Sequence, residues 1–144
     1  MQPDLADLQH LSQVISQATA PAFLLGAVAG FLAILITRFG RVLDRMRTLS
    51  EIADDDAPRA RLKAELPRLQ RHARYMNSSI FYAVASALCT TALVVLAFAS
   101  ALLGFRHEPV VAWAFMLALG LMGVSLVYLA LEVRLGLAEL ELFR

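Results

Sequence analysis

The sequence predicts an all-α membrane protein with three transmembrane helices. Of its 144 residues, 59% are hydrophobic and 17% are charged, whereas globular domains average about 45–50% apolar and about 25% charged residues. The apolar residues are concentrated in three blocks without Asp, Glu, Lys, Arg or His. Each block reaches the roughly 18 residues that mark a transmembrane helix. We place the spans at residues 20–37, 77–104 and 110–131.

The basic residues predict how the chain is threaded. Ten of the 13 Lys and Arg residues lie between Arg38 and Arg74, and none precedes the first span. The positive-inside rule therefore places residues 38–76 in the cytoplasm. The N-terminus and the turn at 105–109 then face outward, and the tail at 132–144 is cytoplasmic.

An amphipathic helix is expected over residues 1–19, on the outer face of the membrane. Its apolar residues recur at helical spacing: Leu5, Leu8, Leu11 and Ile15. The helix lies either on the membrane surface or against protein, on a neighbouring subunit or the second outer loop. Thr19 is a plausible N-cap of the first span, with Pro21 in its first turn.

The basic segment 38–76 is expected to form a cytoplasmic helical hairpin. Two apolar stripes flank the turn-forming stretch EIADDDAPRA: Phe39, Val42, Met46 and Leu49 before it, and Leu62, Leu66, Leu69, Ala73 and Met76 after it. Such a hairpin extends the first two spans by roughly 15–23 Å at 1.5 Å per residue. Pro67 is expected to kink the returning helix rather than end it.

The arginines of the hairpin form two rows, Arg38, Arg41 and Arg45 on one helix and Arg68, Arg71 and Arg74 on the other. They serve either as an anchoring band that sets topology or as a site for an anion or a lipid headgroup.

Small residues and hydroxyls mark two packing faces. Ala22, Gly26 and Gly30 recur at intervals of four, which lets a second helix approach closely, either within the chain or in another copy. The second span carries a polar line that includes Ser79, Tyr82, Ser86 and Thr90. This line either bonds a neighbouring helix or lines a permeation path in a homo-oligomer.

Glu132 lies near the cytoplasmic boundary, at the expected level of Arg38 and Arg74. We expect an ion pair with one of these arginines; exposure to solvent is the alternative.

Motifs typical of enzymes are missing from the sequence. There is no metal-ligand spacing, nucleophile elbow or Gly-rich phosphate loop. We therefore expect no catalytic residues, metal or cofactor, and no small-molecule substrate can be identified. No nucleic acid partner is expected either, because the basic segment lies close to the bilayer and is interleaved with acidic residues.

Two segments, TAPAFLLGAVAGFLAILITRFGRVLDRMR and LPRLQRHARYMNSSI, resemble a family of small bacterial inner-membrane proteins of unknown function. The family's Pro-Ala-Phe-Leu-Leu start corresponds to residues 21–25. Its arginine-rich motif after the first span corresponds to Arg38, Arg41, Asp44, Arg45 and Arg47, and a later pair to Arg71 and Arg74. The resemblance implies a three-span protein of the bacterial inner membrane and supplies no activity.

The leading hypothesis is a non-enzymatic membrane protein that assembles as a homo-oligomer or binds another protein, in contact with membrane lipids. The alternative is a small oligomeric ion channel lined by the polar face of the second span.

Overall fold

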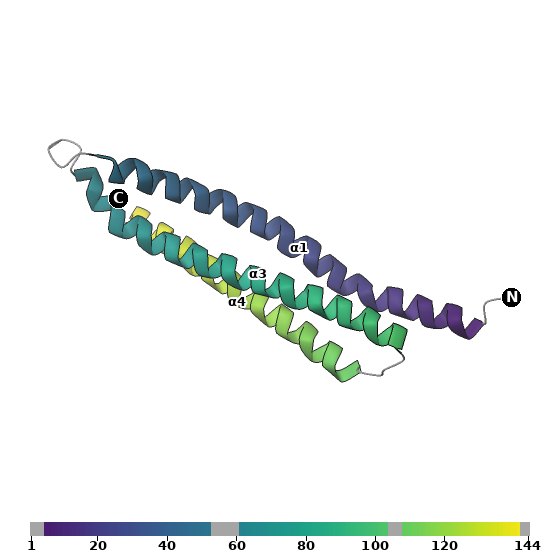
Figure 1. Cartoon of the computed structure of the whole chain (residues 1–144). Helices are drawn as coiled ribbons and strands as arrows, with labels where there is room; N and C mark the ends of the chain where they lie inside the picture. Colours follow the sequence, from purple (N-terminus) through teal and green to yellow (C-terminus); the bar gives the residue numbers. More distant parts are fainter. Residues whose placement is uncertain (1–4, 53–60, 104–107, 142–144) are drawn as a thin grey trace.

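A computed structural model of the chain describes residues 5–52, 61–103 and 108–141 (Figure 1). These residues form helix α1 (Leu5–Ser50), the 3₁₀ turn η1 (Arg61–Glu65), helix α3 (Leu66–Leu103) and helix α4 (Glu108–Glu141). No strand occurs among them. All three α-helices contain a stretch long and apolar enough to cross a membrane. The all-α fold with three potential membrane spans is thus confirmed.

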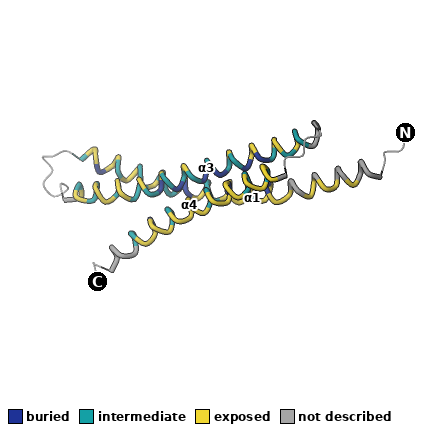
Figure 2. The backbone as a smooth tube through the Cα atoms, turned by 90° about the horizontal axis from the view of Figure 1, so that it is seen from below, coloured by how far each residue is buried: buried dark blue, intermediate teal, exposed yellow. Residues whose placement is uncertain are grey.

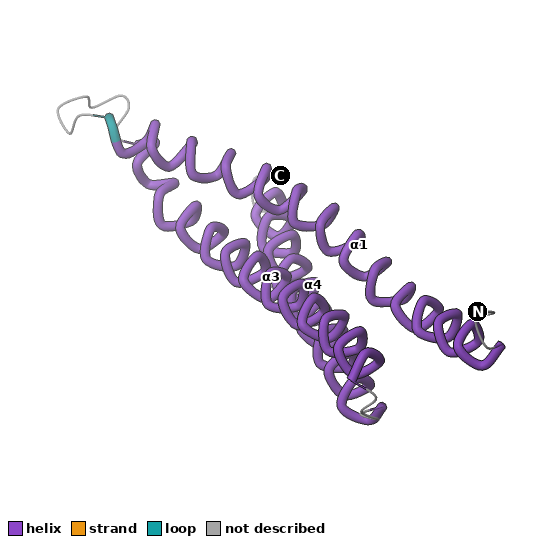
Figure 3. Tube along the Cα trace, turned by 45° about the vertical axis from the view of Figure 1, so that its right-hand side comes forward, coloured by secondary structure: helices purple, strands orange, loops and turns teal. Residues whose placement is uncertain are grey.

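Helix α3 is the centre of the structure. It packs along both α1 and α4, whereas α1 and α4 share no comparable contact in the described part of the chain. Consecutive helices run antiparallel and lie nearly side by side (Figures 1 and 3). The described helices therefore form two antiparallel pairs that share α3, not a closed three-helix bundle.

A seven-residue repeat explains why α3 can pack on two sides. Its buried residues alternate in steps of three and four: Met76, Ser79, Ala83, Ser86, Thr90 and Leu93. The buried residues of α1 and α4 are spaced by multiples of seven: Val28, Leu35 and Leu49 on α1, and Ala118, Ser125 and Glu132 on α4. This spacing is the pattern of left-handed coiled-coil packing. Figure 2 shows that burial is concentrated in the middle of the structure, along α3.

The start of α1 differs from the sequence prediction. A separate helix over residues 1–19 was expected, but α1 continues through Thr19 and Pro21 without interruption. Thr19 is not an N-cap, because its hydroxyl donates to the carbonyl oxygen of Ile15 at 3.1 Å. Proline removes only one hydrogen bond from a long apolar helix. In a membrane helix this loss is tolerated because neighbouring groups satisfy the freed carbonyl. The side chains of Leu5, Leu8 and Leu11 lie outside the described residues, so the amphipathic face remains a prediction.

The expectation of a kink at Pro67 was wrong. The α-helix begins at Leu66, and the residues before it form the 3₁₀ turn η1. The proline ring clashes with the carbonyl four residues earlier and offers no N–H, so an α-helix starts more easily at proline than it passes through it. The chain between α1 and η1, residues 53–60, lies outside the described residues, and the predicted hairpin turn falls there.

Candidate functional site

One residue from each long helix meets in a charge cluster: Arg38 of α1, His72 of α3 and Glu132 of α4. The Nη2 group of Arg38 donates to Oε2 of Glu132 at 3.0 Å and lies 3.4 Å from Oε1. Nδ1 of His72 lies 3.3 Å from Oε1 of the same carboxylate. Of the two arginines considered for Glu132 in the sequence, Arg38 is therefore the one at ion-pairing distance.

Burial makes Glu132 the centre of the cluster. Its side chain is 7% exposed, against 14% for His72 and 40% for Arg38. A buried carboxylate is costly unless charged or polar groups compensate it. Here two groups from two other helices do so, and Arg38 keeps part of its side chain in contact with the surroundings.

His72 was not predicted as a site residue, although its spacing in the sequence places it on the packed face of α3. His72 lies three residues after Leu69 and four before Met76, so it continues the same three–four repeat that packs α3. Its neighbour on α4 is Gly136, where an added Cβ would lie 3.7 Å from Cε1 of His72. The histidine ring thus lies beside a position without a side chain, one turn beyond Glu132.

The cluster connects the two outer helices. Because α1 and α4 share no extended contact among the described residues, the Arg38–Glu132 pair fixes their relative height. The described residues contain no group of three or more His, Cys, Asp or Glu side chains that could hold a metal ion. The contacts of Glu132 with α1 and α3 suit holding the three helices together.

The arginines of the two predicted rows differ in their surroundings, and a site for an anion or a lipid headgroup between the rows stays a prediction. Arg45 donates to Glu65 at 3.3 Å, which links α1 to η1 at an exposed position. Arg41, Arg71 and Arg74 are exposed. Arg68 is exposed as well and has an interaction of its own.

The polar face of the second span lies against α4. Oγ of Ser79 donates to the carbonyl oxygen of Ser125 at 2.9 Å, and Oγ of Ser125 donates to the carbonyl oxygen of Ser79 at 2.6 Å. Oγ of Ser86 donates to the carbonyl oxygen of Ala118 at 2.7 Å. Thr90, also fully buried, donates to the carbonyl oxygen of Ser86 within α3. The hydroxyls of Ser79 and Ser86 thus bond a neighbouring helix, whereas that of Thr90 bonds its own helix.

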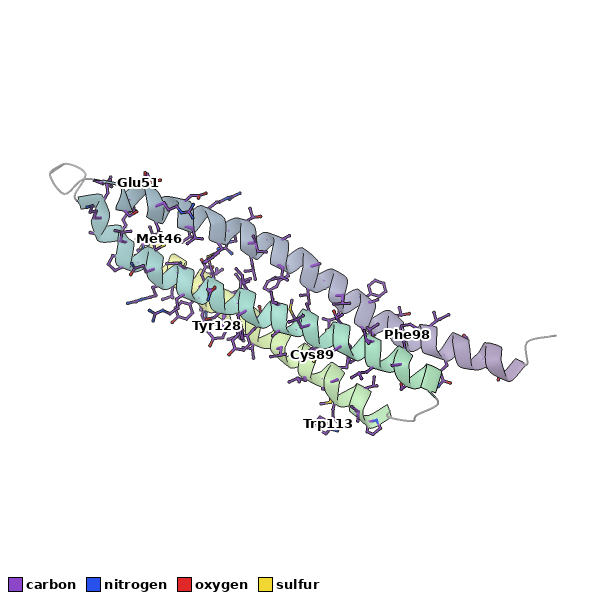
Figure 4. All side chains as sticks on the ribbon, viewed as in Figure 1. Met46, Glu51, Cys89, Phe98, Trp113 and Tyr128 are labelled. Carbon is purple, nitrogen blue, oxygen red and sulfur yellow. The ribbon has the colours of Figure 1, made fainter. Side chains whose placement is uncertain are left out.

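Aromatic rings continue the α3–α4 contact towards the charge cluster. Tyr128 of α4 stacks on Tyr82 with ring centroids 5.4 Å apart and planes 9° apart. It also lies 6.4 Å from Tyr75, one heptad earlier on α3. Figure 4 shows Tyr128 beside α3, and Cys89 further along the same helix pair. Sγ of Cys89 lies 3.4 Å from the carbonyl oxygen of Ala114.

The small residues of α1 lie against no other helix in the described part of the chain. Ala22, Gly26 and Gly30 are exposed, and a Cβ added at either glycine would meet no atom within 4 Å. The described structure therefore leaves this face open.

Comparison with known proteins identifies a family for the chain. A family described as "protein of unknown function (DUF2721)" matches residues 18–142. No curated protein and no solved structure matches the chain.

Proposed function

Since the chain belongs to the DUF2721 family of proteins of unknown function, its role must be inferred from its own surface, and we propose a homo-oligomeric assembly protein of the bacterial inner membrane. In this proposal the protein is not an enzyme. Residues 38–76 and the C-terminus face the cytoplasm, and the N-terminus faces outward.

The open face of α1 carries this proposal. Without a hydrophobic driving force between helices in lipid, close packing of small residues is a main source of helix association. Ala22, Gly26 and Gly30 offer such a surface, and no described residue of the chain covers it. A second copy presents the same face, so two α1 helices can pack through it symmetrically.

The thinness of the fold supports the same conclusion. Only 17%, 22% and 11% of the most apolar windows of α1, α3 and α4 are buried. Most of each helix therefore contacts lipid or other protein, and two helix pairs sharing α3 leave ample room for further subunits.

The test is to count subunits in nanodiscs by native mass spectrometry. We expect more than one copy per particle for the wild type, and a shift towards one copy when Gly26→Leu and Gly30→Leu are combined. Gly120→Leu is the matched control, because Gly120 of α4 is also exposed with nothing within 4 Å of an added Cβ. A monomeric wild type, or equal effects of both sets of leucines, would contradict the proposal.

The channel alternative is less favoured by the contacts of α3. A pore lined by this helix needs Ser79, Ser86 and Thr90 to face water, but all three are fully buried. Ion flux through reconstituted wild-type protein would favour the channel if Ser86→Leu abolished it without changing thermal stability or subunit number.

A further inference from the structure

Each long helix carries an exposed column of residues spaced by seven, and each column has an arginine at the same end of the structure. The columns are Ala20, Ala27, Ile34 and Arg41 on α1; Arg74, Phe81, Leu88 and Val95 on α3; and Trp113, Gly120, Val127 and Arg134 on α4. All twelve positions are exposed.

The large side chains of these columns point away from the packed seams. Phe81 and Leu88 are 65% and 66% exposed, and Trp113 is 70% exposed. A seven-residue spacing keeps positions on one side of a helix that packs with a seven-residue repeat. The buried seam and the exposed columns are thus two sets of positions of the same seven-residue repeat. Figure 4 shows Trp113 pointing outward at the end of α4 that is distant from the charge cluster.

The three column arginines lie at nearly one level. The Arg38–Glu132 and His72–Glu132 contacts fix the relative height of the three helices. Arg41 lies about three residues from Arg38, Arg74 about two from His72, and Arg134 about two from Glu132. At 1.5 Å per residue, Arg41 and Arg134 lie about 5 and 3 Å from the cluster on one side. Arg74, on the antiparallel helix, lies about 3 Å from it on the other side, so the three arginines fall within about 8 Å along the helix axes.

The columns have the length of a bilayer crossing. Arg41 to Ala20, Arg74 to Val95 and Arg134 to Trp113 each span about 21 residues, or about 31 Å, close to the ~30 Å of a hydrocarbon core. Trp113 ends its column where an interfacial aromatic residue is expected. The arginines then lie at the headgroup level of one leaflet.

We propose that Arg41, Arg74 and Arg134 bind the phosphate groups of anionic phospholipids whose acyl chains lie along the three columns. None of these arginines forms an ion pair within the described part of the chain, in contrast to Arg38 and Arg45. The arginine guanidinium can bind two phosphate oxygens at once. Because the columns lie on all three helices, a surrounding layer of lipid fits them better than one protein partner would.

The experiment measures thermal unfolding of the purified full chain in neutral detergent during titration with lipid. Phosphatidylglycerol is compared with phosphatidylcholine of the same acyl chains. We expect phosphatidylglycerol to raise the unfolding midpoint at a lower mole fraction than phosphatidylcholine does. Replacing Arg41, Arg74 or Arg134 by Gln should lower the apparent affinity for phosphatidylglycerol about fivefold per arginine, as about 1 kcal/mol per cation implies.

Arg47→Gln is the matched control, because Arg47 is an exposed arginine of α1 about 9 Å further from the charge cluster than Arg41. It should leave the affinity for phosphatidylglycerol unchanged. Equal midpoints with the two lipids would overturn the proposal, as would single Gln variants that all keep the wild-type affinity. The same midpoint shift with inorganic phosphate alone would also overturn it, since the site would then bind a free anion.

Discussion

At the scale of single residues, Glu132 determines how the outer helices are joined. Among the residues that the structure describes, it is the only acidic side chain that is buried, and it is held by cationic or polar groups of α1 and α3. The two members of the Arg38–Glu132 ion pair differ in exposure, since the side chain of Arg38 is 40% exposed and that of Glu132 only 7%. Removing one partner should therefore have a different effect from removing the other.

We predict that Arg38→Gln destabilises the protein more than Glu132→Gln. The first variant leaves a buried carboxylate without its arginine, at a cost approaching the about 3–5 kcal/mol of a broken buried pair. The second leaves a half-exposed guanidinium that can turn towards water or lipid phosphate, at a cost of about 1–2 kcal/mol. Membrane insertion should be unaffected in both.

Unfolding in mixed micelles of increasing denaturing detergent measures this difference. The double variant Arg38→Gln with Glu132→Gln should be more stable than Arg38→Gln alone, because no buried charge remains. A double variant as unstable as the sum of both single changes would show that the two side chains act independently.

The sequence indicated the ion pair because Glu132 follows an uncharged span and lies level with the arginines after the first span. It did not choose between Arg38 and Arg74, since that choice depends on how each helix is rotated. In the structure Arg74 lies on the exposed column of α3, and His72, two residues earlier, lies on the packed seam. The three–four repeat that separates them can be read from the sequence only once α3 is known to pack on two sides.

At the scale of elements, the α3–α4 seam depends on small hydroxyl side chains. Ser79 and Ser125 bond each other's carbonyl groups in the buried contact, and Ser86 bonds Ala118. Such residues bring the helix backbones close and satisfy their own hydroxyl groups at the same time. Large apolar side chains at these positions would separate the helices.

We predict that Ser79→Ala combined with Ser125→Ala costs about 1 kcal/mol of stability, because interhelix hydrogen bonds in membrane proteins contribute about 0.6 kcal/mol each. Ser79→Leu should cost several times more, because Ser79 is fully buried and the larger side chain overpacks the seam. Thr91→Val is the control, because the exposed Thr91 hydroxyl bonds only Ala87 within its own helix. The same detergent unfolding assay checks all three, and a Thr91→Val cost equal to that of the alanine pair would contradict the role of the seam.

The three long helices could be predicted from the sequence, but some of their boundaries could not. The spans could be predicted because uncharged stretches of this length leave few alternatives to a membrane helix. The boundary at Thr19 could not, because a cap residue followed by proline resembles a helix start whether or not the helix continues. The sequence also showed that Pro67 must disturb the returning helix. It did not show that α3 begins there, because this depends on the 3₁₀ turn that precedes it.

At the scale of the whole molecule, one seven-residue repeat organises both the buried seams and the exposed columns. Buried positions join α1 and α4 to α3, and exposed positions seven residues apart face outward from each helix. The charge cluster aligns the helices so that Arg41, Arg74 and Arg134 lie near one level, within about 8 Å of one another along the helix axes. This level divides the apolar parts of the helices from the basic extension formed by the end of α1, η1 and the start of α3.

The sidedness of that extension gives the last prediction. Ten of the 13 Lys and Arg residues lie between Arg38 and Arg74, and translocating so many cations is strongly disfavoured. With Cys89→Ser removing the only native cysteine, single cysteines are introduced at Gln9 and at Asp55. An impermeant maleimide applied to intact cells should label Gln9→Cys and leave Asp55→Cys unlabelled until the membrane is permeabilised.

Because α1 connects these two regions as one helix, they must lie on opposite sides if α1 crosses the bilayer once. Labelling of Asp55→Cys alone in intact cells would invert the topology and place the arginine level in the outer leaflet, whereas labelling of both would argue that α1 does not cross the membrane.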